Sequence, residues 1–230
     1  MSVIGLIGAM DEEVAVIKQW MANLKEQNIA GCDFYTGQFE GKQVVLLKSG
    51  IGKVNAALST TLLLSQFKPD YVINIGSAGG YDAEQKVGDV VISDRVIHHD
   101  VDVTAFGYVM GQVPSMPEAY LADVALVEKA KRALEKATTA GAKVGLIGTG
   151  DSFMSDPVRV ALVRETFPDL VAVEMEAAAV AQVCYKFGTP FVVVRALSDI
   201  AGKESPQSFE EYLKVAAENS SLMIQQMLRD

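Results

Sequence analysis

Acidic side chains stand at the ends of apolar runs in three distant parts of this chain, where they could carry out acid–base chemistry. Glu176 follows the run LVAVE, Asp199 ends the run FVVVRALSD, and Glu13 follows the run VIGLIGA. An isolated buried charge is costly, so an acid at a strand end faces solvent, a partner or a ligand. Because the carboxyl ends of parallel strands share one edge of a sheet, we expect these three carboxylates to converge.

Each of these acids also has a simpler interpretation. Glu13 lies near the start of a predicted helix, where an acid favours the helix dipole, and Asp11 and Glu12 compete with it for any chemical role. Asp199 can serve as the cap of a helix or loop. Only the combination of acids at one sheet edge favours a functional site.

A charged guanidinium inside an apolar strand belongs to the same region. Arg195 lies within FVVVRALSD, and its burial requires a carboxylate partner, for which both Glu176 and Glu174 are available. Glycine turns at residues 50–52 and 76–80 follow strands and would let backbone amides approach a ligand. Neither turn completes a dinucleotide fingerprint or a Walker A loop.

Other reactive side chains are few. We expect structural roles for His98 and His99, the two histidines, because a metal site would need further ligands from elsewhere. No G-x-S-x-G nucleophile elbow is present, which argues against a Ser-His-Asp hydrolase. Cys32 and Cys184 lie far apart in the sequence, so we expect buried free thiols, as in a reducing cytoplasm.

Apolar runs alternate with helical patterns along the whole chain, and these elements must position the acids. Strands are predicted at VIGLIGA, on both sides of a hairpin turn at Glu40-Gly41, and at YVINIGSAGG, VVISDRVIHH, KVGLIGTG, LVAVE and FVVVRALS. Helices are predicted through Val14, Ile17 and Met21, over 53–67, from about 118 to 137, from Asp156-Pro157, over 175–187, and from about 209 to 228. Residues 100–117 are predicted to form an ordered loop.

Continuous Val, Ile and Leu runs separated by amphipathic helices predict a mostly parallel sheet that is covered on both faces. The early hairpin makes this sheet mixed. We therefore expect an α/β fold, with one domain over residues 1–230 and three α/β/α layers around a central twisted mixed sheet. Neither a repeat nor a domain linker interrupts the pattern.

The bulk composition limits the class of partner. Half of the 230 residues are hydrophobic, the formal charge is −9, and no run of Lys or Arg occurs. A nucleic acid would therefore be repelled, which favours a small-molecule substrate. The N-terminal segment is apolar but short and soon acidic, so it is neither a signal peptide nor a membrane span. We expect a cytoplasmic protein without membrane association.

Six motifs, in their order along the chain, resemble the nucleoside phosphorylase/hydrolase superfamily and, within it, the 5′-methylthioadenosine/S-adenosylhomocysteine nucleosidases. They are IGAMDEEV, LLKSGIGKVNAA, INIGSAGG, HHDVDVTAFGY, VAVEMEAAAVA and FVVVRALSD. The resemblance covers essentially the whole chain, and VEMEAAA with RALSD alone would identify the superfamily. It implies a nucleoside phosphorylase-like fold, a homodimer, and a reaction that requires neither a metal nor an organic cofactor.

The resemblance also implies roles for individual residues. Glu13 matches the base that activates water, and Asp199 matches the acid that protonates adenine N7. Glu176 matches the residue that holds the ribose hydroxyls, with Arg195 supporting its carboxylate. The other substrate-binding positions implied are Met10, Ile51 and Phe209 around the 5′-thio group, Ser77, Gly79 and Met175 beside the sugar, Phe153 and Met154 near the purine, Val173, and Ser198, which positions Asp199.

Two details of the resemblance concern the loop and the purine side. The loop that bears Phe106, Tyr108 and Pro114 is implied to reach the active site of the partner subunit. Met154 is a minor departure from the family pattern. The family tolerates aliphatic replacement at this position, because it is the backbone there that is implied to contact the purine.

The implied reaction is hydrolysis of the N-glycosidic bond of 5′-methylthioadenosine, S-adenosylhomocysteine and 5′-deoxyadenosine, which would place the enzyme in methionine salvage and S-adenosylmethionine recycling. Adenine leaves poorly until N7 is protonated, and water must attack the opposite face of an oxocarbenium-like sugar. One carboxyl must therefore stay protonated while another is ionised. We expect Asp199 to be the former and Glu13 the latter.

Alternatives remain open at this point. A phosphorylase of the same superfamily would use phosphate, but hexameric purine nucleoside phosphorylases carry an arginine two residues before the GS-x-G turn, where this chain has Asn74. A non-catalytic nucleoside sensor would not need the acids, and a dinucleotide-dependent dehydrogenase would need fingerprint glycines that are missing. Futalosine-type nucleosides are further candidate substrates.

Overall fold

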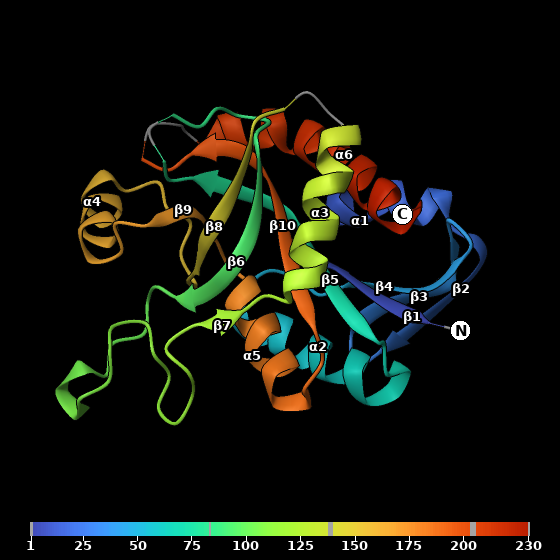
Figure 1. Ribbon diagram of the computed structural model, residues 1–230, viewed down its shortest axis with the longest axis horizontal. Helices are drawn as coiled ribbons and strands as arrows, with labels where there is room; N and C mark the ends of the chain where they lie inside the picture. Colours follow the sequence, from blue (N-terminus) through green and yellow to red (C-terminus); the bar gives the residue numbers. More distant parts are fainter. Residues whose placement is uncertain (1, 83, 138–139, 203–205, 230) are drawn as a thin grey trace.

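Strands and helices alternate along the chain in a computed structural model, which describes residues 2–82, 84–137, 140–202 and 206–229 (Figure 1). The strands are β1 (Val3–Gly8), β2 (Ala22–Ile29), β3 (Cys32–Phe39), β4 (Lys42–Lys48), β5 (Tyr71–Gly80), β6 (Val90–His98), β7 (Tyr120–Leu121), β8 (Ala142–Thr149), β9 (Leu170–Glu174) and β10 (Phe191–Ile200). The helices are α1 (Asp11–Trp20), α2 (Lys53–Phe67), α3 (Val124–Ala137), α4 (Pro157–Thr166), α5 (Ala177–Phe187) and α6 (Pro206–Arg229).

All the strands belong to one mixed sheet, as the sequence predicted. The order is β10-β6-β8-β9-β5-β1-β4-β3-β2, with β7 paired to β6. Strand β5 also pairs with β10, so β10, β6, β8, β9 and β5 close into a ring. This closure was not predicted. It brings the carboxyl ends of β5, β9 and β10 close together, because β5 pairs with both of the other strands.

Helices cover the sheet in two groups, which confirms the three-layer arrangement. Helix α6 packs against α1, α3, β5 and β10, whereas α2 packs against α5, β1 and β4 (Figure 1). Most of the buried apolar side chains form one continuous core between these layers. A smaller core lies beneath α4, beside β9. The Val, Ile and Leu runs of the central strands are buried on both faces, as expected for strands covered by helices.

Local sequence signals explain several element boundaries. The hairpin between β3 and β4 turns at Glu40 and Gly41, both with positive φ, as a two-residue turn requires. The Asp156 carboxylate accepts hydrogen bonds from the backbone amides of Val158 and Arg159, so it caps α4 as predicted. Gly188, with a φ of +67°, ends α5.

Two short or polar strands were missed by the sequence reasoning. Strand β2 is mostly exposed and pairs with β3, and its sequence ANLKEQNI carries no apolar alternation to reveal it. Strand β7 has two residues and pairs with β6. The predicted start of α3 near residue 118 was also too early, because Asp123 accepts a hydrogen bond from the Leu126 amide at the helix start.

The two cysteines are buried free thiols, as expected. Burial raises the pKa of the Cys184 thiol to about 12, so it is unreactive at neutral pH. Within the part of the chain that the structure describes, every helix is too short or too polar to span a bilayer.

Candidate active site

A cavity of about 300 Å³ opens beyond the carboxyl ends of β1, β5, β9 and β10. This is where ligands bind in open α/β sheets. The three acids that the sequence singled out all line it, so their predicted convergence is confirmed. The lining residues are Ala9, Met10, Glu13, Ile51, Ser77, Ala78, Gly79, Phe153, Val173, Glu174, Met175, Glu176, Ser198, Asp199 and Phe209.

Glu13 is the acid of the first helix that enters the cavity. Its side chain reaches back to the end of β1, where Oε2 accepts hydrogen bonds from the amides of Ala9 (2.7 Å) and Met10 (3.2 Å). Oε1 accepts from the Ser77 amide (2.9 Å) and hydroxyl (3.1 Å). Its neighbours Asp11 and Glu12 are exposed to solvent. Of the three acids, Glu13 is therefore the one that lines the cavity.

Gly76 allows Glu13 to lie close to the buried Arg195. Its φ is +150°, and an added Cβ would lie 2.2 Å from Arg195 Nη1 and 2.7 Å from Glu13 Oε1. Real Cβ atoms do not approach other atoms so closely. Gly76, which the sequence placed in a glycine turn, is thus required by the packing of two charged side chains across the backbone of β5.

Asp199 owes its orientation to a bulge near the end of β10. Leu197 pairs with Ala78 and Asp199 pairs with Gly79, so the register shifts by one residue at Ser198. Such a bulge redirects the side chains that follow it. The Ser198 hydroxyl donates a hydrogen bond to Asp199 Oδ1 (2.9 Å). This contact agrees with the implied role of Ser198, which is to position Asp199. The Asp199 side chain is 6% exposed and lines the cavity.

Glu176 lines the cavity from the residue just before α5. Its Oε1 accepts a hydrogen bond from the Gly52 amide (2.9 Å), and Oε2 lies 3.7 Å from Arg195 Nη2. The pKa of Glu176 is raised to about 8, mainly by burial and then by the nearby Glu174 carboxylate, while Arg195 opposes the shift. Burial and the Glu174 charge thus favour the protonated form of Glu176, whereas Arg195 favours the ionised form.

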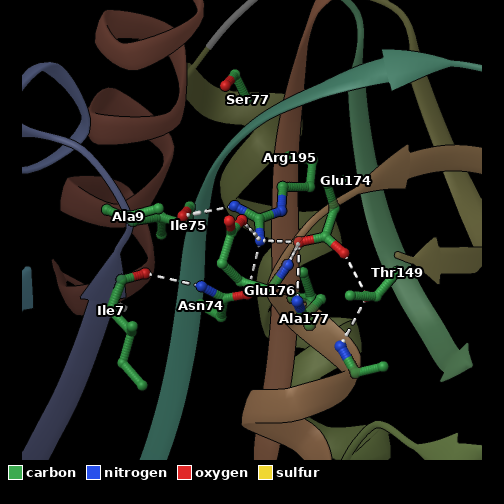
Figure 2. Close-up of polar contacts among 12 residues, drawn as sticks. Ile7, Ala9, Asn74, Ile75, Ser77, Thr149, Glu174, Glu176, Ala177 and Arg195 are labelled. Atoms are coloured by element: carbon green, nitrogen blue, oxygen red, sulfur yellow. Dashed lines mark hydrogen bonds and ion pairs between the residues drawn. The ribbon is translucent and has the colours of Figure 1, made fainter. Parts of the chain in front are cut away.

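Arg195 lies behind the cavity wall rather than in it. Its guanidinium forms an ion pair with Glu174 and donates hydrogen bonds to Asn74 Oδ1 (2.9 Å) and the Ile75 carbonyl (2.8 Å) (Figure 2). The alternatives that the sequence left open are thus resolved: Glu174 is the contact partner, and Glu176 is the more distant one. The charge of Arg195 stabilises both carboxylates from outside the cavity.

Apolar side chains form the outer walls of the cavity. Phe153 and Phe209 pack edge to face with ring centroids 5.6 Å apart, although they come from segments more than fifty residues apart in sequence. Met10 and the half-exposed Ile51 also line the cavity. An apolar group on a ligand would find contacts here.

Some predicted residues lie outside this cavity. Met154 lines a smaller recess of about 30 Å³, which shares Phe153, Val173 and Asp199 with the cavity. Phe106, Tyr108 and Pro114 belong to the loop over residues 100–117 and do not line the cavity of their own chain. Ala9, Ala78 and Glu174 also line the cavity, although they are not among the predicted site residues.

The histidines lie away from the cavity. His98 and His99 are buried, and a ring nitrogen of His98 lies 3.0 Å from Gln182 Oε1. Burial lowers the pKa of both imidazoles, so both are neutral at physiological pH. Across the described residues, no group of three or more His, Cys, Asp and Glu side chains is arranged to hold a metal ion.

Comparisons with known proteins agree with this geometry. The model of the phosphorylase superfamily matches residues 3–229. The 5′-methylthioadenosine/S-adenosylhomocysteine nucleosidase of Marinomonas sp. (strain MWYL1) is 81% identical over 229 residues, which cover 100% of this chain and 99% of that protein.

Solved structures give the same result. The nucleosidase of Colwellia psychrerythraea 34H, solved in complex with adenine, is 52% identical with a TM-score of 0.97, over 99% of this chain and 94% of that one. The nucleosidase of Neisseria meningitidis, in complex with methylthio-immucillin-A, is 46% identical with a TM-score of 0.97, over 100% and 99%. The chain therefore belongs to the phosphorylase superfamily and, within it, to the 5′-methylthioadenosine/S-adenosylhomocysteine nucleosidases.

Proposed function

We propose that this protein hydrolyses the N-glycosidic bond of 5′-methylthioadenosine and S-adenosylhomocysteine, and also of 5′-deoxyadenosine, to release adenine and the sugar product. One observation carries the choice of water over phosphate. The described residues that line the cavity include four carboxyl side chains and no Lys, Arg or His. A phosphate dianion would meet only negative or neutral groups there, whereas water would not be repelled.

The arrangement supports separate tasks for the two catalytic acids. Glu13 is held by four hydrogen-bond donors, so its carboxylate is oriented as an acceptor and serves as the base that takes a proton from the attacking water. Asp199, directed by the bulge and by Ser198, donates a proton to adenine N7. The leaving base then departs as a neutral molecule while the sugar becomes oxocarbenium-like.

The rest of the cavity divides among the parts of the nucleoside. Glu176 binds the ribose hydroxyls, with Arg195 behind its carboxyl. Ser77, Gly79 and Met175 lie beside the sugar. The purine packs against Phe153, Val173 and the Met154 segment, and the 5′-thio group lies among Met10, Ile51 and Phe209.

The active form is proposed to be a homodimer of single-domain subunits in the cytoplasm. The loop over residues 100–117 projects away from the body of the molecule (Figure 1), and Phe106 at its short helical turn is 81% exposed. Val109 of the same loop is also exposed, so the loop presents more than one apolar side chain that another chain could cover. Phe106, Tyr108 and Pro114 would then complete the cavity of the partner subunit.

Adenine release in matched buffers with and without phosphate tests the choice of hydrolysis. We expect adenine from both thionucleosides at the same rate in either buffer, with a free thiosugar as the second product. A sugar 1-phosphate formed only with phosphate would support the phosphorylase instead. Binding without any turnover would support the nucleoside sensor. Futalosine-type nucleosides belong in the same assay as further candidate substrates.

A further inference from the structure

The Glu174 carboxylate is saturated with hydrogen-bond donors. Oε1 accepts from the Thr149 hydroxyl, and Oε2 accepts from the amides of Glu176 (2.9 Å) and Ala177 (2.8 Å) and from Arg195 (Figure 2). Only 3% of its side chain is exposed. Although it touches the cavity wall, both oxygens of Glu174 are engaged by protein groups, among them the buried Arg195 and the first amides of α5.

Glu174 and Thr149 together supply the N-terminal cap of α5. The capping position is held by Glu176, but its side chain makes no capping hydrogen bond. The first amides of the helix are satisfied instead by Glu174 and by the Thr149 hydroxyl, which accepts from the Ala178 amide (2.8 Å). A short polar side chain at the N-cap position usually makes these hydrogen bonds, but here groups at the ends of β8 and β9 make them. Glu176 is therefore released from capping.

Glu174 is also the contact ion-pair partner of Arg195. The guanidinium is fully buried and is further held by Asn74 and by the Ile75 carbonyl. Glu176 Oε2 lies 3.7 Å from Nη2, within reach of the charge but beyond hydrogen-bonding distance. Within the part of the chain that the structure describes, the Gly52 amide is the one hydrogen-bond donor to the Glu176 carboxyl, which otherwise faces the cavity.

We propose that Glu174 is a positioning residue, which engages Arg195 and the start of α5 and thereby reserves the Glu176 carboxyl for the hydroxyls of the nucleoside sugar. This inference rests on the proposed function, in which Glu176 binds those hydroxyls. It assigns the two acids of VEMEAAA opposite tasks: the first is fully occupied by protein groups, and the second is kept open for the ligand.

Replacing Glu174 with Gln would redistribute these interactions. The variant keeps the size of the side chain but removes the negative charge. Among the described residues, Glu176 is then the remaining carboxylate within ion-pair distance of Arg195. Arg195 would move onto Glu176, and the sugar hydroxyls would have to compete with it. The pKa of Glu176 would fall, because Glu174 raises it and Arg195 lowers it.

A comparison of two substrates tests this positioning role. We expect Glu174→Gln to lower kcat/KM for 5′-methylthioadenosine by about 10- to 100-fold, the size of a lost hydrogen bond to a charged group. The 2′,3′-dideoxy counterpart lacks the hydroxyls, so its already low kcat/KM should change by less than about 3-fold. Equal losses on both substrates would overturn the proposal.

Thr149→Val is the matched control. It loosens the same buried turn of α5 but changes no charge, so we expect it to affect both substrates equally. If Glu174→Gln does not fold, Glu174→Asp replaces it. This variant keeps the negative charge on a side chain that is shorter by one methylene group. We therefore expect a smaller loss of kcat/KM, and only on the substrate that carries the sugar hydroxyls. An Asp variant that affects both substrates alike would count against the proposal.

A carbon-13 NMR titration of labelled glutamate carboxyls gives a readout without turnover. Glu176 is identified as the signal that disappears in Glu176→Gln. We expect its titration in the ligand-free protein to move to lower pH in Glu174→Gln and to stay in place in Thr149→Val. An unchanged titration in Glu174→Gln would refute the positioning role. Because this result does not need adenine release, it separates failure of the positioning role from failure of the proposed function.

Discussion

Gly76 offers the sharpest structural test, because one added methyl group would meet two charged side chains. Gly76→Ala places a Cβ 2.2 Å from Arg195 Nη1 and 2.7 Å from Glu13 Oε1, at a φ of +150°. A non-glycine residue in a disfavoured backbone region costs about 1–3 kcal/mol. Overpacking of a filled interior costs a further ~1–3 kcal/mol. The variant should therefore lose about 2–6 kcal/mol of folding free energy.

The expected result has two parts. A chain of this size loses roughly 2–4 °C in Tm per kcal/mol, so the melting temperature should fall by roughly 5–20 °C. The added methyl group also displaces Glu13 from its donors, and a displacement of about 1 Å at a catalytic group can reduce kcat by about 100-fold. Calorimetry and an adenine-release assay below the melting transition measure the two effects separately.

Gly31→Ala is the matched control for the backbone conformation. Gly31 has a φ of +83°, and nothing lies within 4 Å of an added Cβ. It should lower the Tm by a few degrees and leave kcat unchanged, because it lies in the turn between β2 and β3. If Gly76→Ala were as stable as Gly31→Ala and turned over normally, the close contact of Glu13 with Arg195 across Gly76 would be refuted.

Two further predictions concern the carboxyls of the cavity. Ser77→Ala removes the hydroxyl that donates a hydrogen bond to Glu13 Oε1 at 3.1 Å but keeps the hydrogen bond from the Ser77 amide. We therefore expect kcat to fall by about 10-fold in steady-state assays. An unchanged kcat would show that this hydroxyl does not orient the base. Glu176 has its pKa raised from 4.5 to about 8 in the folded protein, so the unfolded chain releases its proton first as pH rises. The free energy of unfolding of the ligand-free protein should therefore decrease as the pH rises from 4.5 to about 8 and level off above that. In urea titrations, Glu176→Gln should flatten this dependence on pH. Parallel slopes for the two proteins would contradict the raised pKa of Glu176.

Much of the fold could be predicted because apolar runs and turn residues agree with the elements they form. The segment over residues 53–67 is a helix with those bounds, and the strand predicted at YVINIGSAGG is β5. The exposed β2 could not be predicted, since its pairing depends on backbone hydrogen bonds to β3 rather than on an apolar pattern. Closure of the sheet between β5 and β10 is a long-range pairing that no local pattern indicates.

The site was predictable to a similar extent. Acids at strand ends indicated Glu13, Glu176 and Asp199, and the structure brings all three to one cavity. The bulge at Ser198 could not be predicted, because it depends on how β10 pairs with β5. Nor could the sequence decide which acid Arg195 contacts. A signal was present, since Glu174 ends a buried strand, but two neighbouring acids fit the pattern equally well.

The most direct test of the separate roles of Asp199 and Glu13 is a change of leaving group. A 5′-methylthioribosyl p-nitrophenyl ether has a leaving group that departs without protonation, whereas adenine requires a proton at N7. We predict that Asp199→Asn loses at least about 100-fold in kcat/KM on 5′-methylthioadenosine but remains within about 5-fold of the wild type on the p-nitrophenyl substrate. Glu13→Gln should lose activity on both, because both need activated water. Equal losses of Asp199→Asn on the two substrates, or an active Glu13→Gln, would contradict the account.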